Sequence, residues 1–418
     1  MRVIADLHIH SKYSRATSRD MTLPVIAEWA RIKGIDVVGT GDFTHPAHFA
    51  SIEELLEPAE DGLFTLKKDK GDGPRFILTA EVSNIFSQGG RVRKMHSLLL
   101  APSIEAVRKM NEAFGRLGNI KSDGRPIFGF SSQDLLKIVL DASPDAMLIP
   151  AHAWTPWFSI FGSKSGFDSI DECFGALAEH IRAIETGLSS NPEMNWRLSA
   201  LDDITLISNS DAHSPSKLGR EANVFDCALS YNEITGIIRT KDAKRFLYTV
   251  EFYPEEGKYH YDGHRECGVL YSPQESKAAD KICPVCGKGL TIGVLSRVAE
   301  LSDRPAGYAP PNAIPSRAMV PLEEILSEAF EVGPASKKVQ KEYRRLVAEA
   351  GSEFAILLDM NVADIARLAG EKVALAVAKV RSGDIGITPG FDGEFGKINI
   401  FGKANVPMPA TPGQIKLF

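Results

Sequence analysis

The sequence predicts an α/β fold made of a seven-stranded barrel, a small zinc-binding module and a C-terminal helical region. Three observations predict this arrangement. Short apolar runs alternate with amphipathic segments over about the first 250 residues. Those runs end in polar clusters that are rich in histidine and carboxylate. Beyond residue 250 the composition changes, and paired cysteines and histidines are followed by helical patterns.

The barrel is predicted from seven apolar runs that have the length of strands. Helical patterns lie between them, which favours parallel strands joined by crossover helices. A barrel of this kind has its active site at the carboxyl ends of its strands, where the polar clusters fall. The expected strands are residues 2–8, 35–41, 75–81, 96–102, 146–152, 181–187 and 204–211. The expected helices lie around 22–34, 103–117, 132–140, 168–179 and 191–202.

Four parts are expected along the chain. They are a barrel of residues 1–250, a zinc-binding module of residues 251–300, a helical DNA-contacting region of residues 301–402 and a flexible tail of residues 403–418. Proline-rich residues 302–321 have the composition of a linker or an extended packed loop. Helices are then expected over 321–330, 336–350 and 361–383, and a short hairpin over 391–402.

Composition limits the class of protein. The 418 residues carry 48 Lys and Arg against 54 Asp and Glu, and the net charge of −6 excludes a uniformly basic nucleic-acid coat. No run of 18 apolar residues exists, so neither a membrane-spanning helix nor a membrane partner is expected. Five cysteines do not make a disulfide framework in a chain of this length, and the N-terminus lacks the apolar core of a signal peptide. We expect a cytoplasmic protein, associated with the nucleoid.

Histidines and carboxylates gather at the expected strand ends. His8 and His10 alternate by two, so on a strand both point to one face and can grip one metal ion. A single pair of this kind is often incidental. Scattered surface histidines, however, would not place six of the ten histidines beside strand ends together with four carboxylates. These ten residues are His8, His10, His45, His96, His152, His213, Asp6, Asp42, Glu81 and Asp211.

In order and spacing these motifs resemble those of the polymerase-and-histidinol-phosphatase superfamily. The resemblance implies a distorted seven-stranded (β/α) barrel that holds two or three divalent metals, Zn, Mn or Mg, for phosphoester hydrolysis. By its pattern one metal is held by His8, His10, Glu81 and Asp211, and a second by Glu81, His96 and His152. Two departures concern a third metal: the loop of residues 11–15 lacks a histidine, and Asp42 is followed by Phe43 rather than His. If a third metal is present, it is expected near Asp42, His45 and His213.

The expected chemistry agrees with these residue types. Two metals roughly 3.5–4 Å apart can clamp the attacking and leaving oxygens of a phosphoryl displacement and lower the pKa of water. No serine or cysteine nucleophile is then required. Asp211, Glu81 and Asp42 are the carboxylates expected to take part in catalysis, with Asp211 also orienting the attacking water.

A second group of ligand residues predicts a structural zinc. His264 and Cys267 are followed after fifteen residues by Cys283 and Cys286, and Pro284 and Gly287 shape a tight turn around this second pair. His264, Cys267, Cys283 and Cys286 are the preferred ligands, with His260 as the alternate. The alternative is that these cysteines are free thiols or form a reducible disulfide.

Three segments are candidates for contact with DNA. The expected helix over 336–350 gathers basic residues that either contact phosphates or form a solvated face. The loop of residues 91–94 either holds a phosphodiester near His96 or is a charged hairpin tip. Aromatic residues after His152 either stack on a base or pack internally. The candidate residues are Lys337, Lys338, Lys341, Arg344, Arg345, Arg91, Arg93, Lys94, Trp154 and Trp157.

Within the superfamily, the chain resembles the endonuclease Q family over nearly its whole length. The matching stretches are residues 6–18, 39–46, 151–169, 208–215, 257–268, 283–294 and 389–398. The resemblance implies a DNA repair endonuclease that cuts the phosphodiester 5′ of deaminated bases (uracil, hypoxanthine, xanthine) or abasic sites. The alternatives are a phosphatase acting on a small phosphate ester and a non-catalytic DNA-binding adaptor. The zinc module and the basic helix count against the phosphatase, and the complete set of ligand residues counts against the adaptor.

The C-terminal residues predict a further partner. Gln414, Leu417 and Phe418 follow a segment rich in proline, which is expected to keep them extended and accessible. Their pattern resembles the short motif by which bacterial repair and replication proteins bind the sliding clamp. Leu417 and Phe418 would fill an apolar pocket while Gln414 contacts its rim. The alternative is a chance match, which is frequent for short motifs.

Overall fold

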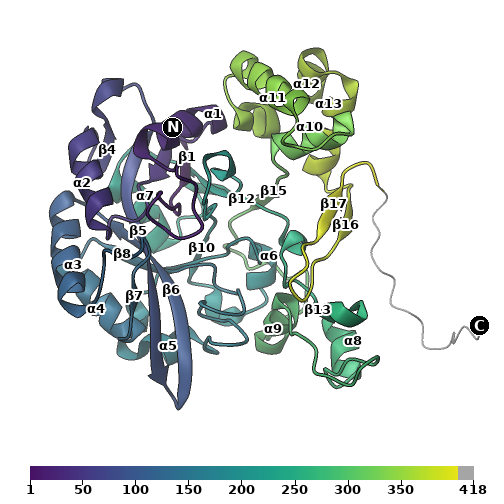
Figure 1. Cartoon of the computed structure of the whole chain (residues 1–418), viewed down its shortest axis with the longest axis horizontal. Coiled ribbons are helices and arrows are strands. Elements are labelled where there is room, and N and C mark those ends of the chain that lie inside the picture. Colours follow the sequence, from purple (N-terminus) through teal and green to yellow (C-terminus); the bar gives the residue numbers. More distant parts are fainter. Residues whose placement is uncertain (403–418) are drawn as a thin grey trace, which may run out of the picture.

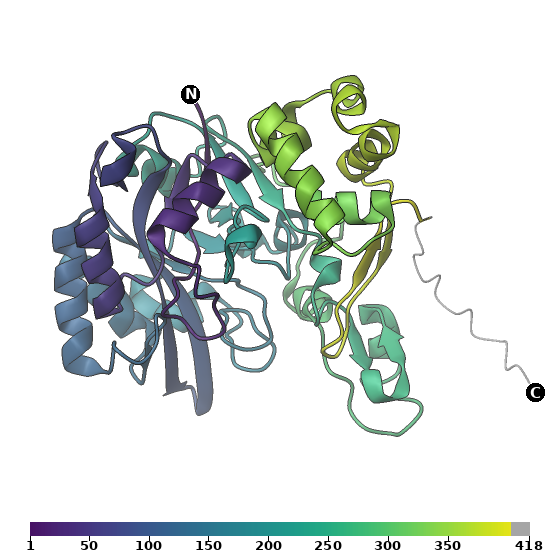
Figure 2. The same ribbon diagram turned by 45° about the horizontal axis from the view of Figure 1, so that its top comes forward.

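The computed structural model describes residues 1–402 and shows a mixed α/β protein (Figure 1). Residues 1–251 form most of a large sheet with helices packed around it, at the left of Figure 1. The helical region lies at the upper right, and the module with the paired cysteines lies at the lower right. Figure 2 shows the strands β16 and β17 running between these two smaller parts. Within residues 1–402, none of the helices is long and apolar enough to cross a membrane.

All seven predicted strands are present. They are β1 (Arg2–Asp6), β2 (Val37–Gly39), β5 (Arg75–Gln88), β6 (Arg91–Ala101), β8 (Met147–Pro150), β9 (Ala183–Glu185) and β10 (Thr205–Ile207). Strands β1, β2 and β5 run parallel in the centre of the main sheet. Strands β9 and β10 form a separate parallel pair. The hydrogen-bonded ladders therefore do not run continuously through the seven strands.

The main sheet is larger and less parallel than expected. In the described residues it has 11 strands, because β3 (Leu56–Pro58), β4 (Leu63–Leu66), β7 (Ile127–Phe128), β11 (Ala222–Asp226), β12 (Phe246–Glu251) and β15 (Ser316–Ala318) join it. Strand β11 pairs antiparallel with β1, and β6 pairs antiparallel with both β5 and β8. The proline-rich segment was therefore only partly a linker, since its strand β15 pairs parallel with β12.

Strands β5 and β6 form one long hairpin, which corrects the expectation of a loop over residues 91–94. Gly89 and Gly90 connect the strands with φ values of 61° and 72°. Two consecutive left-handed residues form the tight turn that matches the twist of a hairpin. The ladder consequently extends from Gln88 opposite Arg91 to Leu78 opposite Ala101.

Helices cover the sheet largely where amphipathic patterns predict them. They include α1 (Leu23–Lys33), α3 (Ile104–Leu117) and α4 (Ser132–Ala142), and two helices that were not expected, α2 (Pro46–Leu55) and α7 (Tyr231–Thr240). Two predicted helices are much shorter. Only α5 (Ile170–Phe174) is α-helical within 168–179, because Gly175 leaves the helical conformation at a φ of 53°. Only α6 (Pro192–Asn195) is α-helical within 191–202.

The helical region contains α10 (Leu322–Phe330), α11 (Lys337–Ala350), α12 (Val362–Ala369) and α13 (Glu371–Ser382). The single helix expected over 361–383 is divided at Gly370, which has a φ of 88°. A buried ion pair between Lys33 on α1 and Glu353, 2.5 Å apart, fastens this region to the main sheet. The hydroxyl of Tyr343 on α11 also donates to Glu353, at 2.6 Å.

The cysteine module is built from β13 (Asp262–His264), β14 (Val269–Tyr271), α8 (Pro273–Ala278) and α9 (Val294–Leu301). The hairpin predicted over 391–402 begins earlier than expected, because its first strand β16 (Gly386–Thr388) precedes that range and only β17 (Lys397–Asn399) lies within it. Its loop packs on the module, because Phe391 forms a bridge with Tyr261 and lies against Gly263. The last part of the helical region therefore supports the module.

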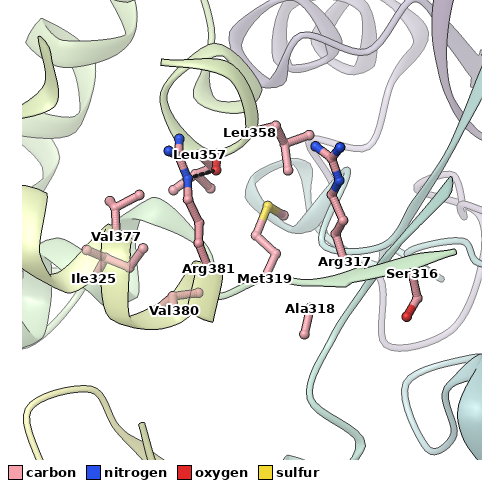
Figure 3. A pocket seen from close by; sticks show the side chains of 10 residues that line it. All are labelled: Ser316, Arg317, Ala318, Met319, Ile325, Leu357, Leu358, Val377, Val380 and Arg381. Atoms are coloured by element: carbon pink, nitrogen blue, oxygen red, sulfur yellow. Dashed lines mark hydrogen bonds between the residues drawn. The ribbon is translucent and has the colours of Figure 1, made fainter. Parts of the chain in front are cut away.

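A cavity of about 320 Å³ lies between β15 and the helices α10 and α13 (Figure 3). Its lining is mainly aliphatic, with Met319, Ile325 and Val377 among its side chains. Arg381 crosses it and donates to the carbonyl oxygens of Ile356 and Leu357, at 2.8 Å each. The lining holds no histidine, cysteine or carboxylate, so this cavity is not the predicted metal site.

Candidate metal centre

Four of the predicted ligands come together: His8 and His10 follow β1, Asp211 follows β10, and Glu81 lies in the middle of the long strand β5. Nε2 of His10 lies 3.0 Å from Oδ1 of Asp211 and 3.3 Å from Oε2 of Glu81. Nε2 of His8 lies 3.7 Å from both of these oxygens. His8, His10 and Glu81 are fully buried. Ligands about 2.0–2.2 Å from a tetrahedral metal are separated by roughly 3.3–3.6 Å, so these atoms have the spacing of a coordination shell.

Three of the four ligand atoms of this first cluster have no hydrogen-bond partner among the described residues. Nε2 of His8, Nε2 of His10 and Oδ1 of Asp211 are buried and accept or donate no hydrogen bond within the described residues. Buried polar atoms are nearly always satisfied, by protein, water or an ion. Three such atoms directed at one point therefore fit a divalent cation.

A carboxylate behind each histidine fixes the direction of its ring. Nδ1 of His8 lies 3.0 Å from Oε2 of Glu185, and Nδ1 of His10 lies 3.1 Å from Oδ1 of Asp42. Such contacts set the tautomer and leave Nε2 to the metal. Asp42 was expected among the catalytic or third-metal residues. Glu185 was not predicted, although it lies at the end of an expected strand.

A second cluster shares Glu81 with the first. Oε1 of Glu81 lies 2.7 Å from Nδ1 of His96 and 3.1 Å from Nε2 of His152, and these two nitrogens are 3.2 Å apart. The first cluster uses the other oxygen, Oε2. One carboxylate therefore faces two groups of ligand atoms, as a bridging ligand does. The phenyl ring of Phe158 packs over His96, with ring centroids 4.6 Å apart.

Strained backbone accompanies these side chains. Asp42, His152 and Asp211 have φ values of 45°, 30° and 47°. Non-glycine residues rarely adopt the left-handed region, and such strain concentrates at functional sites. The left-handed conformation of these three residues costs backbone free energy, and it directs their side chains into the site.

The residues expected around a third metal do not assemble. Oδ2 of Asp42 accepts hydrogen bonds from the N–H and hydroxyl of Ser11 and from the hydroxyl of Ser14, and Oδ1 faces His10. Nε2 of His45 is hydrogen-bonded to the carbonyl oxygen of Lys121, at 3.2 Å. Among residues 1–402 no group of metal-ligand atoms includes Asp42, His45 or His213. The donor set does not fit a third metal.

His213 borders the first cluster without joining it. Its ring lies 4.4 Å from that of His10, and its Nδ1 is 2.8 Å from the carbonyl oxygen of Asp211. Burial lowers the pKa of His213 and favours the neutral ring. Asp6, the last residue of β1, accepts hydrogen bonds from the backbone N–H groups of Ser210 and Gly219 and has a structural role.

The electrostatics of the site favour bound cations. Although burial opposes ionisation, the neighbouring histidines, His10 above all, hold the pKa of Asp211 far below its usual range. The pKa of Glu81 is also lowered well below its usual range, because His96 and Arg125 outweigh the effect of burial. Burial lowers the pKa of His96 to about 4. Ionised carboxylates and the neutral imidazole of His96 are the protonation states that metal binding requires. Although burial opposes it, the surrounding carboxylates raise the pKa of His8, His10 and His152, so a metal has to displace protons from these three rings.

Arg125 is a neighbour of the site that the sequence did not indicate. Its Nη1 donates to Oε2 of Glu81 at 2.8 Å, and 26% of its side chain is exposed. It lies in the loop between α3 and β7, far from any expected strand end. Only the fold brings this loop next to β5.

Outside the main sheet, the preferred zinc ligands also come together. Ligand atoms of His264, Cys267, Cys283 and Cys286 all lie within 4.8 Å of one another. His260, the alternate, is not part of this group. It is buried against Tyr261, and burial lowers its pKa to about 4. One histidine and three cysteines form a donor set that suits a closed structural zinc site.

The two tryptophans expected at the DNA surface differ. Trp154 is only 1% exposed, and its Nε1 donates to Oδ1 of Asn195 at 2.7 Å. It packs on Phe161 and therefore cannot stack on a base, which corrects the prediction for this residue. Trp157 is 41% exposed and meets Tyr259 of the cysteine module edge to face.

The basic residues also separate into two groups. Arg93 is buried beneath the ring of Phe167 and donates hydrogen bonds to the carbonyl oxygen of Gly166 and to the carboxylate of Glu172. The prediction that Arg93 contacts DNA is therefore wrong. Arg345 is partly exposed and forms ion pairs with Glu342 and Glu349. The remaining predicted residues are half-buried or exposed, namely Arg91, Lys94, Lys337, Lys338, Lys341 and Arg344. Gln414, Leu417 and Phe418 lie outside the described residues.

Comparison with known proteins finds relatives for part and for all of the chain. Residues 321–384 match the family model described as the MJ0043 C-terminal domain. Over 253 residues the chain is 32% identical to the uncharacterized protein MJ0043 of Methanocaldococcus jannaschii. That match covers 59% of this chain but only 31% of the relative, so the chain spans about a third of that curated relative's length.

Two solved structures are similar over nearly the whole chain. The lesion-specific endonuclease PfuEndoQ of Pyrococcus furiosus is 34% identical, with a TM-score of 0.85 over 96% of this chain and 95% of that chain. A complex of endonuclease Q with a 27-mer duplex that has an abasic lesion at the active site is 33% identical, with a TM-score of 0.83 over 97% of this chain and 99% of that chain.

Proposed function

The chain belongs to the endonuclease Q family, and from this membership and the metal centre we propose that it is a metal-dependent DNA repair endonuclease. Its substrate is duplex DNA that contains a deaminated base (uracil, hypoxanthine or xanthine) or an abasic site. It hydrolyses the phosphodiester on the 5′ side of the lesion. The abasic duplex bound by the solved relative supports this substrate class.

One observation carries the proposal. Glu81 faces His8 and His10 through one oxygen and His96 and His152 through the other. Two groups of ligands that share one carboxylate fit two neighbouring divalent cations. Such a pair, when bound, polarises the phosphate and makes water a nucleophile without a serine or cysteine.

The chain's own residues prepare the site for that reaction. Glu185 and Asp42 hold the rings of His8 and His10 so that both Nε2 atoms face the same point. Asp211 stays ionised because its pKa is far below the usual range, so its carboxylate can accept a hydrogen bond from the attacking water and orient it. Burial of Glu81 keeps bulk water away from the bridging position.

The finer architecture is proposed on the same basis. The seven strands that carry the ligands form a distorted barrel of the polymerase-and-histidinol-phosphatase type over residues 1–250. Residues 251–300 form a module held by one structural zinc, and residues 301–402 form a helical region that contacts DNA. The ligand set His264, Cys267, Cys283 and Cys286 supports the zinc.

DNA is proposed to contact the face that joins the barrel to the cysteine module. Trp157 is exposed there and touches Tyr259, and Lys94 lies over Phe158 next to His96. Trp157 directly precedes Phe158, which packs on His96, and an exposed tryptophan at this place is suited to stack on a displaced or neighbouring base. Lys337, Lys338, Lys341 and Arg344 on the exposed side of α11, and Arg91 on the hairpin, are proposed to contact phosphates.

A protein partner is also proposed. Gln414, Leu417 and Phe418 are expected to bind the replication sliding clamp, which would bring the endonuclease to DNA behind the replication fork. The proposal rests on the sequence of these residues alone.

The experiment that tests the function compares two substrates. Metal-loaded protein is incubated with a generic phosphomonoester and, separately, with an end-labelled duplex that carries one abasic site. An endonuclease nicks the duplex and leaves the monoester nearly unchanged. Hydrolysis of the monoester without nicking would establish a phosphatase instead.

A further inference from the structure

Arg125 occupies the junction of the two ligand clusters. Its Nη1 lies 2.8 Å from Oε2 of Glu81, and the same oxygen faces Nε2 of His8 and of His10. A guanidinium has donors only and is always charged, so it is not a metal ligand. It places a permanent positive charge beside the carboxylate that joins the two clusters.

The loop that carries Arg125 is held rigidly. The backbone N–H of Gly124 donates to the carbonyl oxygen of Tyr13 at 2.9 Å, and Asp123 accepts from the backbone N–H of Arg125 at 3.1 Å. A Cβ at Gly124 would lie 2.3 Å from Oδ2 of Asp42, so only glycine permits this approach. Pro126 follows Arg125 and further restricts its backbone.

This loop covers the position at which a third metal was expected. Gly124 lies against Asp42, and the carbonyl oxygen of Lys121 is bonded to His45. Two of the three residues expected there are therefore engaged elsewhere, His45 by this loop and Asp42 by Ser11, Ser14 and His10. The cation that the structure shows on this side of the site is Arg125.

Most of the guanidinium remains available to a ligand. Glu81 is its hydrogen-bond partner within residues 1–402, so Nε and Nη2 have no protein acceptor among the described residues. The side chain is 26% exposed, so part of it is open to solvent and to a ligand. A planar guanidinium binds two phosphate oxygens, or one oxygen through two N–H groups, with defined geometry.

We propose that Arg125 is a catalytic residue that binds a non-bridging oxygen of the scissile phosphate and supplies the positive charge for which a third metal was expected. This inference rests on the proposed function. In the hydrolysis, water supplies both the hydroxyl that phosphorus gains and the proton that the leaving sugar oxygen takes up. Arg125 keeps its own protons, and its hydrogen bonds strengthen as negative charge grows on the oxygen in the transition state.

The test compares Arg125→Gln, Arg125→Lys and the control Arg15→Gln. Arg15 is a matched control because it pairs with Asp123 of the same loop but its side chain is 78% exposed. Under single-turnover conditions with saturating abasic duplex, Arg125→Gln should slow cleavage by about 100- to 1,000-fold, the usual effect of losing one transition-state donor. Arg125→Lys should be intermediate, and Arg15→Gln should remain within about threefold of the wild type.

Two further readouts separate phosphate binding from support of Glu81. Metal content per chain should be the same in Arg125→Gln and the wild type. Duplexes with each phosphorothioate diastereomer at the scissile bond should be cleaved at different rates by the wild type, and Arg125→Gln should reduce that ratio at least about tenfold. A cleavage rate close to that of the wild type, an unchanged ratio or a loss of metal would each overturn the inference.

Failure of the proposed function gives a different result. If the wild type cleaves no lesion-containing DNA, the same variants are compared on bis(p-nitrophenyl) phosphate, a small phosphodiester. Arg125→Gln should then be slower than both the wild type and Arg15→Gln. Equal rates for the three proteins would refute the role of Arg125 independently of the DNA substrate.

Discussion

Oε2 of Glu185 lies 3.0 Å from Nδ1 of His8, and this contact fixes which nitrogen of the imidazole faces the metal centre. Glu185 also accepts from the backbone N–H of His152 at 2.9 Å and from the side-chain amide of Asn209 at 2.9 Å. One buried carboxylate therefore receives donors from both ligand clusters. Its position explains how residues on three strands remain aligned.

The variant Glu185→Gln should weaken metal binding in the barrel. A glutamine has only one acceptor oxygen, so its amide group would face one of the three donors that now meet a carboxylate. Loss of a contact behind a metal ligand lowers affinity by about 10- to 100-fold. Calorimetric titration of the metal-free protein with metal measures the change in affinity. Glu193→Gln is the control, because Glu193 accepts a hydrogen bond from the hydroxyl of Ser316. This variant should bind metal with the same affinity as the wild type.

The variant Cys283→Ser should remove about one zinc per chain and destabilise residues 255–292, because a structural zinc site derives folding energy from the metal. Elemental analysis and hydrogen exchange measure the two effects. Cys227→Ser changes a buried thiol that lies outside the cluster and should retain its zinc. An unchanged zinc content in Cys283→Ser would contradict the assignment of the module.

The two tryptophans should respond differently to alanine. Trp157 is exposed, and loss of one stacking side chain worth about 1–3 kcal/mol should reduce the preference for damaged over undamaged DNA by roughly tenfold. Trp154 is buried, so Trp154→Ala should lower the free energy of unfolding by about 3–5 kcal/mol. Binding to both duplexes and thermal unfolding distinguish these effects. Unchanged lesion preference in Trp157→Ala would leave that residue with a packing role only.

Deletion of residues 414–418 should abolish capture by the sliding clamp and leave cleavage of short oligonucleotides unchanged. Leu417 and Phe418 are the apolar residues of the motif, so Leu417→Ala combined with Phe418→Ala should have the same effect. A pull-down with purified clamp and a cleavage assay measure the two properties. Equal clamp binding by the truncated and full-length proteins would rule out the motif.

The parts of the site that could be predicted are those with a local signature. His8 and His10 alternate on a strand, and Cys283 and Cys286 have the spacing of a knuckle, so periodicity and spacing sufficed. Every expected strand that carries a ligand is present for the same reason. The hairpin of β5 and β6 was expected only as the alternative for residues 91–94, and its length was not predicted because its outer half is polar, although Gly89 and Gly90 mark its turn.

The parts that could not be predicted depend on contacts between distant segments. Arg125 has no motif around it, and only the folded loop brings it to Glu81. Trp154 and Arg93 have residue types typical of a DNA surface, but tertiary packing buries both side chains. Asp42 follows a strand as a ligand would, yet Ser11, Ser14 and His10 occupy its oxygens. Residue type and spacing do not reveal whether a side chain is buried or already has hydrogen-bond partners within the fold.

The most direct test of the central claim is to map the cut in a 5′-labelled duplex that carries a single abasic site. Metal-loaded wild-type protein should cleave the phosphodiester immediately 5′ of the lesion and leave the undamaged duplex intact. Asp211→Asn should bind the same duplex without cutting it, because a carboxylate ligand is lost with little change in volume. Absence of a lesion-directed cut by the wild type, or cleavage by Asp211→Asn within a few-fold of the wild-type rate, would contradict the account.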